Sequence, residues 1–313
     1  ATPEKIPVDV IFVIDASGSM FGEAAIVQDN MNQFSQRVID EGVDLRTVVI
    51  TRAAFVTVPP PLGVDPERYL FLESRVESND ALVHLLKRYP DYKDFLRPNA
   101  ETHFVAVTDD ESWLTPSCFH ASMTALLNHD FVLHSVASED TKGTDDTLPA
   151  IDGTCDCAPA VDWNTYHPSV CGHYSPPTGG RCATAARVGS AYNALAKHTG
   201  GLTHSICSTD WTVLFDRLTE TVVESALPCA LAVPEPPDGF KINLSKLEVR
   251  RTLGDGQPVL LERSPDDTCS TGEWYLDETG DQSMIQLCQA ACEAGREDEG
   301  TIEITWPCGV PIL

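Results

Sequence analysis

One aspartate and two serines at alternate positions of a short loop are well suited to hold a metal ion. The motif is Asp15-Ala16-Ser17-Gly18-Ser19. Asp15 supplies a charged oxygen, the two hydroxyls supply neutral oxygens, and Gly18 lets the loop turn without a side-chain clash. A small hard cation such as Mg²⁺ prefers about six oxygen ligands. Because neutral hydroxyls leave positive charge on the ion, we expect it to take a further anionic ligand from outside the loop.

The elements around this motif predict that two aspartates meet at one edge of a sheet. Residues 8–14 form a β-branched run typical of a buried parallel strand, and Asp15 follows it directly. A second apolar run, 104–107, leads into Thr108 and Asp109. Ligands of parallel sheets bind at the carboxyl ends of the strands. Both aspartates occupy that position.

Apolar runs and helical patterns alternate along the first two thirds of the chain. Strands are predicted at 8–14, 45–54, 104–107, 131–137 and 202–206, and helices around 27–38, 82–86, 116–129, 185–198 and 210–225. The alternation predicts an α/β fold, a doubly wound, mostly parallel sheet with helices on both faces. Gly200-Gly201 is a typical stop for the fourth helix.

The stretch VIFVIDASGSM at residues 10–20 resembles the first strand and metal loop of von Willebrand factor A domains. That family includes the inserted domains of integrins. The resemblance covers roughly residues 7–226, in motif and in the order of elements, and not the tail. It implies a metal-ion-dependent adhesion site in which a hydroxyl from a second loop and an aspartate from a third complete the ligands.

On this resemblance, Asp109 takes the role of the third-loop aspartate, with Asp110 where the family has glycine. Ser78 provides the second-loop hydroxyl, with Asp80 as the alternative. Trp113, close behind, either packs internally or rims the site. The expected ligands of Mg²⁺, or of Mn²⁺ or Ca²⁺, are Asp15, Ser17, Ser19, Ser78 and Asp109.

The formal charge of the chain is −26, from 47 acidic and 21 basic residues. Such a surface repels nucleic acid and anionic lipid, which need a basic footprint, so we expect no nucleic-acid partner. No apolar run reaches the roughly 18 residues of a transmembrane helix. Because the chain opens with Ala1, we expect any signal peptide or lipid anchor to have been removed or left out.

Eleven cysteines, of which only Cys118 lies in the first 150 residues, indicate disulfides in an oxidising compartment. A secreted or cell-surface protein, extracellular or periplasmic, is therefore expected. The odd count leaves one cysteine unpaired or paired outside the chain. A zinc site formed by Cys155, Cys157, Cys171 and His173 is the alternative use of the central cysteines.

Three regions are predicted. Residues 7–228 form the von Willebrand A-type domain, with a cysteine-rich insertion at about 139–183. Residues 229–313 form a β-rich, disulfide-bonded module that begins with a proline-rich linker at 234–239. Within the module, strands are expected near 247–251 and 259–262, around Asp255-Gly256, and an alternating strand at 301–306.

These observations predict an extracellular, divalent-cation-dependent protein-binding protein and not an enzyme. The metal would bridge to an acidic side chain of a partner protein. Two other functions stay open: a secreted enzyme or enzyme subunit that uses the insertion or the tail, and a structural surface component whose metal only stabilises it. A further alternative is that the two serines merely cap the following helix while Asp15 binds loop amides.

Overall fold

The computed structural model describes residues 6–140, 148–155, 162–164, 166, 172, 174, 180–226, 229–233, 240–241, 243–252, 257–265, 269, 272–278, 283–288, 290–292, 301–305 and 310–311. The chain divides into two compact units. The sheet unit is Ile6–Val223, and the tail unit takes in Glu224–Leu313. Each is described by itself.

The sheet unit is built on six parallel strands in the order β3-β2-β1-β4-β5-β6. The strands are β1 (Val8–Ile14), β2 (Leu45–Thr51), β3 (Tyr69–Glu73), β4 (Glu101–Val107), β5 (Val132–Ala137) and β6 (Thr203–Ser205). The order reverses between β1 and β4, which pair directly, with Val8 opposite Glu101. This is the position in a doubly wound sheet where ligands bind.

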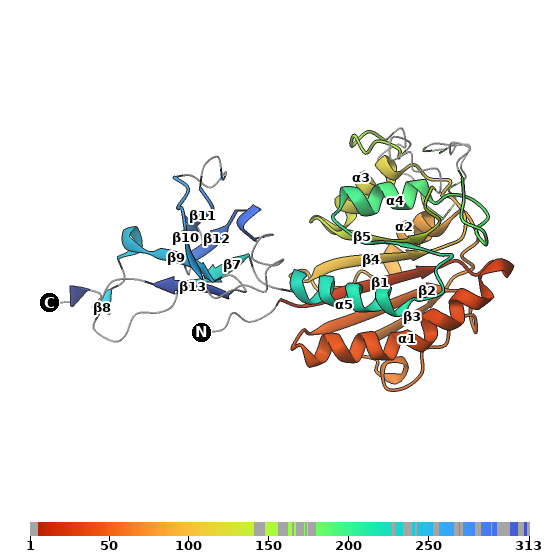
Figure 1. Ribbon diagram of the computed structural model, residues 1–313, viewed down its shortest axis with the longest axis horizontal. Helices are drawn as coiled ribbons and strands as arrows, with labels where there is room; N and C mark the ends of the chain where they lie inside the picture. The colour runs from red at the N-terminus through yellow and green to blue at the C-terminus, as the bar shows by residue number, and fades with distance from the viewer. Residues whose placement is uncertain are drawn as a thin grey trace. The chain divides into compact units, whose positions relative to one another are not determined.

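Helices cover both faces of this sheet (Figure 1). One face carries α1 (Phe21–Asp40) and α5 (Thr212–Ser225), and the other carries α2 (Ala81–Tyr92), α3 (Pro116–Leu127) and α4 (Ser190–His198). Each helix buries an apolar stripe: in α1 the side chains predicted from the sequence, Val27, Met31, Phe34 and Val38, are at most 1% exposed. Burial of these side chains holds the helices on the sheet. The predicted α/β class is confirmed.

Several element boundaries differ from the sequence prediction. β3 was not predicted, although Tyr69–Glu73 contains four β-favouring or apolar residues in a row. β2 ends at Thr51 and not at 54. α3 ends at Leu127 because Asn128 adopts a left-handed conformation, φ 60°. α4 begins at Ser190 and not at 185, because the preceding backbone is bonded to the β4 loop instead.

Two disulfides lie in the described part of the sheet unit, Cys118–Cys155 and Cys182–Cys207. The first ties α3 to the region predicted as an insertion. It also makes Cys155 unavailable as a thiolate. The alternative zinc site with four ligands is therefore wrong where it includes Cys155. The other three candidate zinc ligands, Cys157, Cys171 and His173, lie outside the described residues.

The tail unit is β-rich, as the alternating pattern predicted. Its small antiparallel sheets have the orders β10-β9-β13, β11-β12-β7 and β14-β8. The strands are β7 (Ala230–Ala232), β8 (Phe240–Lys241), β9 (Glu248–Thr252), β10 (Pro258–Leu261), β11 (Trp274–Asp277), β12 (Met284–Leu287), β13 (Thr301–Thr305) and β14 (Val310–Pro311). Trp274, 1% exposed, lies in its core. The turn predicted at Asp255-Gly256 lies outside the described residues.

The tail unit adds the disulfides Cys229–Cys292 and Cys269–Cys288. Eight of the eleven cysteines are thus paired among the described residues, and Cys157, Cys171 and Cys308 lie outside them. Such pairing is typical of an oxidising compartment outside the cytoplasm. Within the described ranges, every helix is too short or too polar to cross a bilayer.

Candidate metal centre

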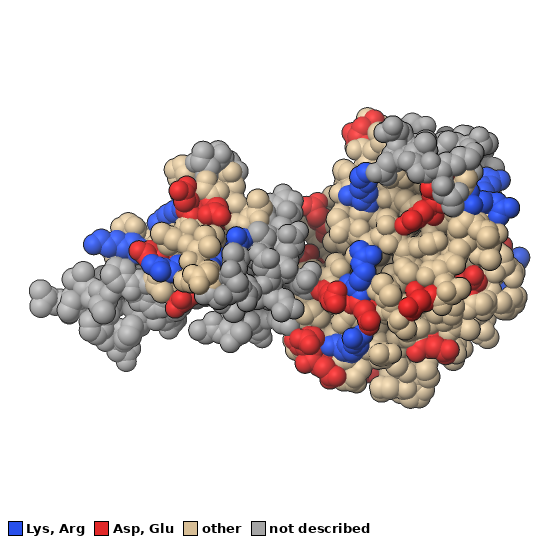
Figure 2. Space-filling view, viewed as in Figure 1, with Lys and Arg blue, Asp and Glu red and all other residues tan. Residues whose placement is uncertain are grey.

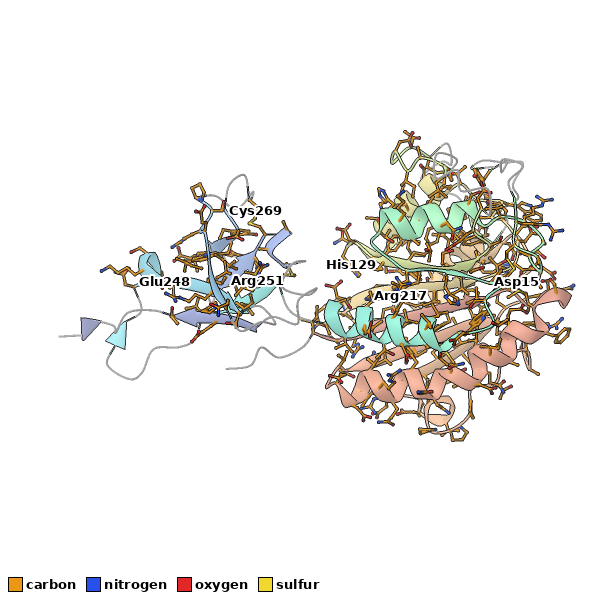
Figure 3. The ribbon with its side chains drawn as sticks, viewed as in Figure 1. Asp15, His129, Arg217, Glu248, Arg251 and Cys269 are labelled. Carbon is orange, nitrogen blue, oxygen red and sulfur yellow. A yellow bond between two sulfur atoms is a disulfide. The ribbon has the colours of Figure 1, made fainter. Side chains whose placement is uncertain are left out.

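Three loops converge at the carboxyl edge of the sheet: the first follows β1, the second follows β3, and the third follows β4. The amide of Ala16 in the first loop donates to the carbonyl of Val76 in the second (3.0 Å), and the amide of Trp113 in the third donates to the carbonyl of Asn79 (2.9 Å). Trp113 is 40% exposed. Figure 3 labels Asp15 at this end of the sheet unit. The loops are therefore bonded to one another through their backbones.

Asp15 stands where β1 ends and is 0% exposed. Its Oδ1 accepts a hydrogen bond from the amide of Ser17 at 2.7 Å. Its Oδ2 accepts one from the hydroxyl of Thr108 at 3.0 Å. The amide of Asp15 donates to the carbonyl of Val107 in β4 (2.9 Å), which fixes the carboxylate at the point where the strand order reverses.

Ser17 and Ser19 bring their hydroxyl oxygens within 3.2 Å of each other. Ser17 precedes the short helix η1 (Gly18–Met20) but makes no capping hydrogen bond with its side chain, and the residue that precedes α1 is Met20. The alternative that these serines cap the following helix is therefore wrong. The second part of that alternative, in which Asp15 accepts a hydrogen bond from a loop amide, is confirmed. Each hydroxyl oxygen keeps a lone pair that could bind a cation.

Asp109 brings the third loop to the first. It is 4% exposed, and its carboxylate lies near the hydroxyl of Ser19. Its Oδ1 is buried without a hydrogen-bond partner among the described residues. Its carbonyl accepts from the amides of Ala186 (2.7 Å) and Arg187 (3.1 Å), the residues just before α4. A buried carboxylate oxygen without a partner is costly, and a cation would satisfy it.

The second loop contacts the cluster through a backbone carbonyl, and the role of the Ser78 hydroxyl stays a prediction. Ser78 joins the cluster through its carbonyl, which accepts from the hydroxyl of Thr108 at 3.2 Å. Asp80, the alternative ligand, is engaged elsewhere. One of its oxygens accepts from the amide of Glu77 (2.7 Å), and the other lies 3.3 Å from Nε2 of His84 in α2.

Two residues at the centre were not predicted from the sequence. Thr108 is 0% exposed and bonds to Asp15, to the Ser78 carbonyl and to the amide of Asp110 (3.2 Å). Its only signal was its place at the end of an apolar strand, next to Asp109. Because its hydroxyl contacts two loops, it holds the Asp15 carboxylate in one orientation.

The second is Glu111, 1% exposed. Its carboxylate accepts from the amides of Ser190 (2.7 Å) and Ala191 (3.0 Å) at the start of α4, from the Ser190 hydroxyl, and from the Ser112 amide (2.9 Å). A carboxylate at a helix N-terminus satisfies amides that have no partner within the helix. Glu111 thereby fastens the third loop to α4 and explains why that helix begins at Ser190.

The electrostatics of the site favour the arrival of a cation. Burial raises the pKa of Asp15 from 3.8 to about 6; the nearby Asp109 carboxylate adds to the rise, and the hydrogen bonds from Ser17 and Thr108 oppose it. Burial also raises the pKa of Asp109, with repulsion from Asp110 adding to the rise and the nearby Ser19 hydroxyl opposing it. Two neighbouring buried carboxylates thus carry, at neutral pH, charge that only a positive ion would offset.

The donor set fits a hard cation. Among the described residues there is no group of three or more His, Cys, Asp and Glu side chains able to hold a metal. What this edge offers is two carboxylates, Asp15 and Asp109, together with the hydroxyls of Ser17 and Ser19. Oxygen ligands of this kind suit Mg²⁺, Mn²⁺ or Ca²⁺ and not zinc.

Comparison with models of known protein families and with curated proteins gave no match to this chain. The resemblance to von Willebrand factor A domains therefore stays a prediction that depends on the motif and on the order of the elements.

Proposed function

We propose that the sheet unit is a von Willebrand A-type binding module that takes up one divalent cation and uses it to bind a carboxylate of a partner protein. The observation that supports this most directly is the buried, unpartnered Oδ1 of Asp109, beside the Ser19 hydroxyl and close to Asp15. Such an arrangement is expensive without an ion and favourable with one.

In this proposal Asp15 and Asp109 supply the negative charge, and Ser17 and Ser19 supply neutral oxygens. Ser78, whose carbonyl accepts from Thr108, would add a further oxygen, and Thr108 orients Asp15. Two carboxylates and neutral hydroxyls do not saturate a cation that prefers about six oxygen ligands. The bound ion would supply positive charge at an otherwise acidic surface, where a partner carboxylate could bind.

The module is proposed to act outside the cytoplasm, secreted or at a cell surface. The four disulfides of the described residues support this location. The net charge of −26 disfavours nucleic acid as a partner.

Isothermal titration calorimetry of the chelator-treated protein tests the metal site. Mg²⁺, Mn²⁺ and Ca²⁺ are titrated into the wild type, into Asp15→Ala, and into a Ser17→Ala, Ser19→Ala double variant. We expect saturable binding by the wild type and loss of it in both variants. Ser208→Ala, in the loop between β6 and α5, is the control and should bind like the wild type. Unchanged affinity in Asp15→Ala would contradict the site.

A further inference from the structure

A continuous strip of one arginine and two phenylalanines lies beside the metal loop. Phe21, the first residue of α1 and two positions after Ser19, is 65% exposed. Its ring lies 5.3 Å from the ring of Phe55, centroid to centroid, and Phe55 is largely buried. The guanidinium of Arg52 lies over the Phe55 ring, 5.2 Å from its centroid. A buried ring thus supports an exposed ring and a cation.

The strip belongs to the same sheet edge as the metal centre. Arg52 directly follows Thr51, whose hydroxyl donates to the carbonyl of Ile14 at 2.9 Å. β1 and β2 run in parallel, with Val13 opposite Ile50. Asp15 and Arg52 are the residues that directly follow these two neighbouring strands. In Figure 2, basic side chains lie at the end of the sheet unit where Figure 3 labels Asp15.

Arg52 differs from the other arginines near this edge. Arg75 pairs with Glu77, and Arg187 lies 3.5 Å from Asp110. Within the described ranges, none of the ion pairs includes Arg52, which is exposed. A guanidinium stacked on a ring keeps its planar set of N–H donors available for a carboxylate. In a chain of charge −26, this is a local positive group at the site.

The loop that carries the strip is held in place before any partner arrives. The amide of Phe55 donates to the carbonyl of Arg52 (3.1 Å), with Ala54 between them in the left-handed region at φ 61°. The amide of Thr57 donates to the Gln28 side chain of α1 at 2.7 Å. A backbone conformation that is unfavourable for alanine persists only where surrounding contacts enforce it, and such positions cluster at binding sites.

We propose that Arg52 and Phe21, supported by Phe55, form a second contact site that selects an acidic segment of a partner protein. The segment would place one carboxylate at the metal, a bulky apolar side chain against Phe21, and a second carboxylate on Arg52. This inference rests on the proposed function, since the metal defines where the first carboxylate binds. Exposed aromatic rings and arginines are the residues that most often dominate binding energy at interfaces. The bound ion and Arg52 would attract the acidic segment locally.

The test is selection from a peptide library with a fixed central aspartate and randomised flanks, on immobilised full-length protein in Mg²⁺ and in chelator. We expect Mg²⁺-dependent enrichment of peptides with an aromatic or aliphatic residue and a second acidic residue near the aspartate. For the best peptide, Phe21→Ser and Arg52→Gln should each raise Kd about tenfold, while Phe21→Leu retains most of the affinity. Leu126→Ser, which removes another exposed apolar side chain (38%) at the end of α3, is the control.

The outcomes separate the two proposals. Two results would overturn the second contact site and leave the metal-dependent function standing. The first is selection of Mg²⁺-dependent peptides that have no apolar or second acidic residue. The second is equal peptide affinity in Phe21→Ser, Arg52→Gln and Leu126→Ser. Selection of peptides that depend on the strip but bind equally in chelator would overturn its link to the metal. If calorimetry shows Mg²⁺ binding and the library yields no Mg²⁺-dependent peptide, both proposals are overturned.

Discussion

Replacing Asp15 by asparagine should stabilise the metal-free protein while abolishing metal binding. The Asp15 carboxylate is fully buried, and burial raises its pKa to about 6 from 3.8. A carboxylate whose pKa is raised on folding makes the folded state less stable once the pH exceeds its unfolded value. The difference between the folded and unfolded pKa values of Asp15 lowers the free energy of unfolding by about 3 kcal/mol at pH values above about 6 and by nearly nothing at pH 4.

Asparagine can occupy the same place with its hydrogen bonds made. Its Oδ1 can accept from the Ser17 amide, as the aspartate does at 2.7 Å. Its Nδ2 can donate to the Thr108 hydroxyl, which then turns its own proton to the Ser78 carbonyl, 3.2 Å away. The variant also relieves the repulsion between Asp15 and Asp109. Removal of the charge is therefore the dominant effect.

Urea unfolding in chelator at pH 4 and pH 8 measures this. The free energy of unfolding of Asp15→Asn should exceed that of the wild type by up to about 3 kcal/mol at pH 8 and should match it at pH 4. With Mg²⁺ at about 100 times Kd, the wild type should gain about 2.7 kcal/mol and the variant nothing. The control is Asp65→Asn, an aspartate outside the site whose carboxylate accepts the Glu67 amide at 3.0 Å, and its free energy of unfolding in chelator should match that of the wild type at both pH values. An Asp15→Asn protein no more stable than the wild type in chelator at pH 8 would refute the reasoning.

Two further stability predictions follow from buried side chains. Thr108→Val should lower the free energy of unfolding in urea by about 1–3 kcal/mol, because it leaves Asp15 Oδ2 without its donor. The control is Thr102→Val, which removes a buried hydroxyl without a partner among the described residues and should leave the stability unchanged or raise it. Equal losses in the two variants would contradict this prediction. His134, fully buried, donates its Nε2 proton towards Nδ1 of His103 (2.9 Å) and accepts from the Leu202 amide. Burial, His103 and Arg217 hold the pKa of His134 well below 6.5, so wild-type stability should fall as the pH drops below about 6.5, by up to about 2 kcal/mol at pH 5. His134→Gln can make both bonds and should lose this part of the pH dependence, whereas His129→Gln should keep it; identical pH profiles of wild type and His134→Gln would rule the explanation out.

The strand and helix pattern of the sheet unit could be predicted because burial is periodic. Strands such as β1 are buried on both faces and appear as uninterrupted apolar runs, and α1 repeats its apolar residues at helical spacing. β3 was missed because it is short and only one of its five residues is buried. The start of α4 was missed because its amides bond to Glu111, a residue about 80 positions away in sequence.

The sequence by itself determined which atoms could hold a cation and that they belong to strand ends, since D-x-S-x-S after a buried run is a local pattern. Only the tertiary structure decided how the other loops take part. It gave Thr108 the central bridging position, brought Ser78 in through its carbonyl, and engaged Asp80 with Glu77 and His84. Side-chain direction in a loop depends on contacts between segments distant in sequence, and no local pattern encodes those contacts.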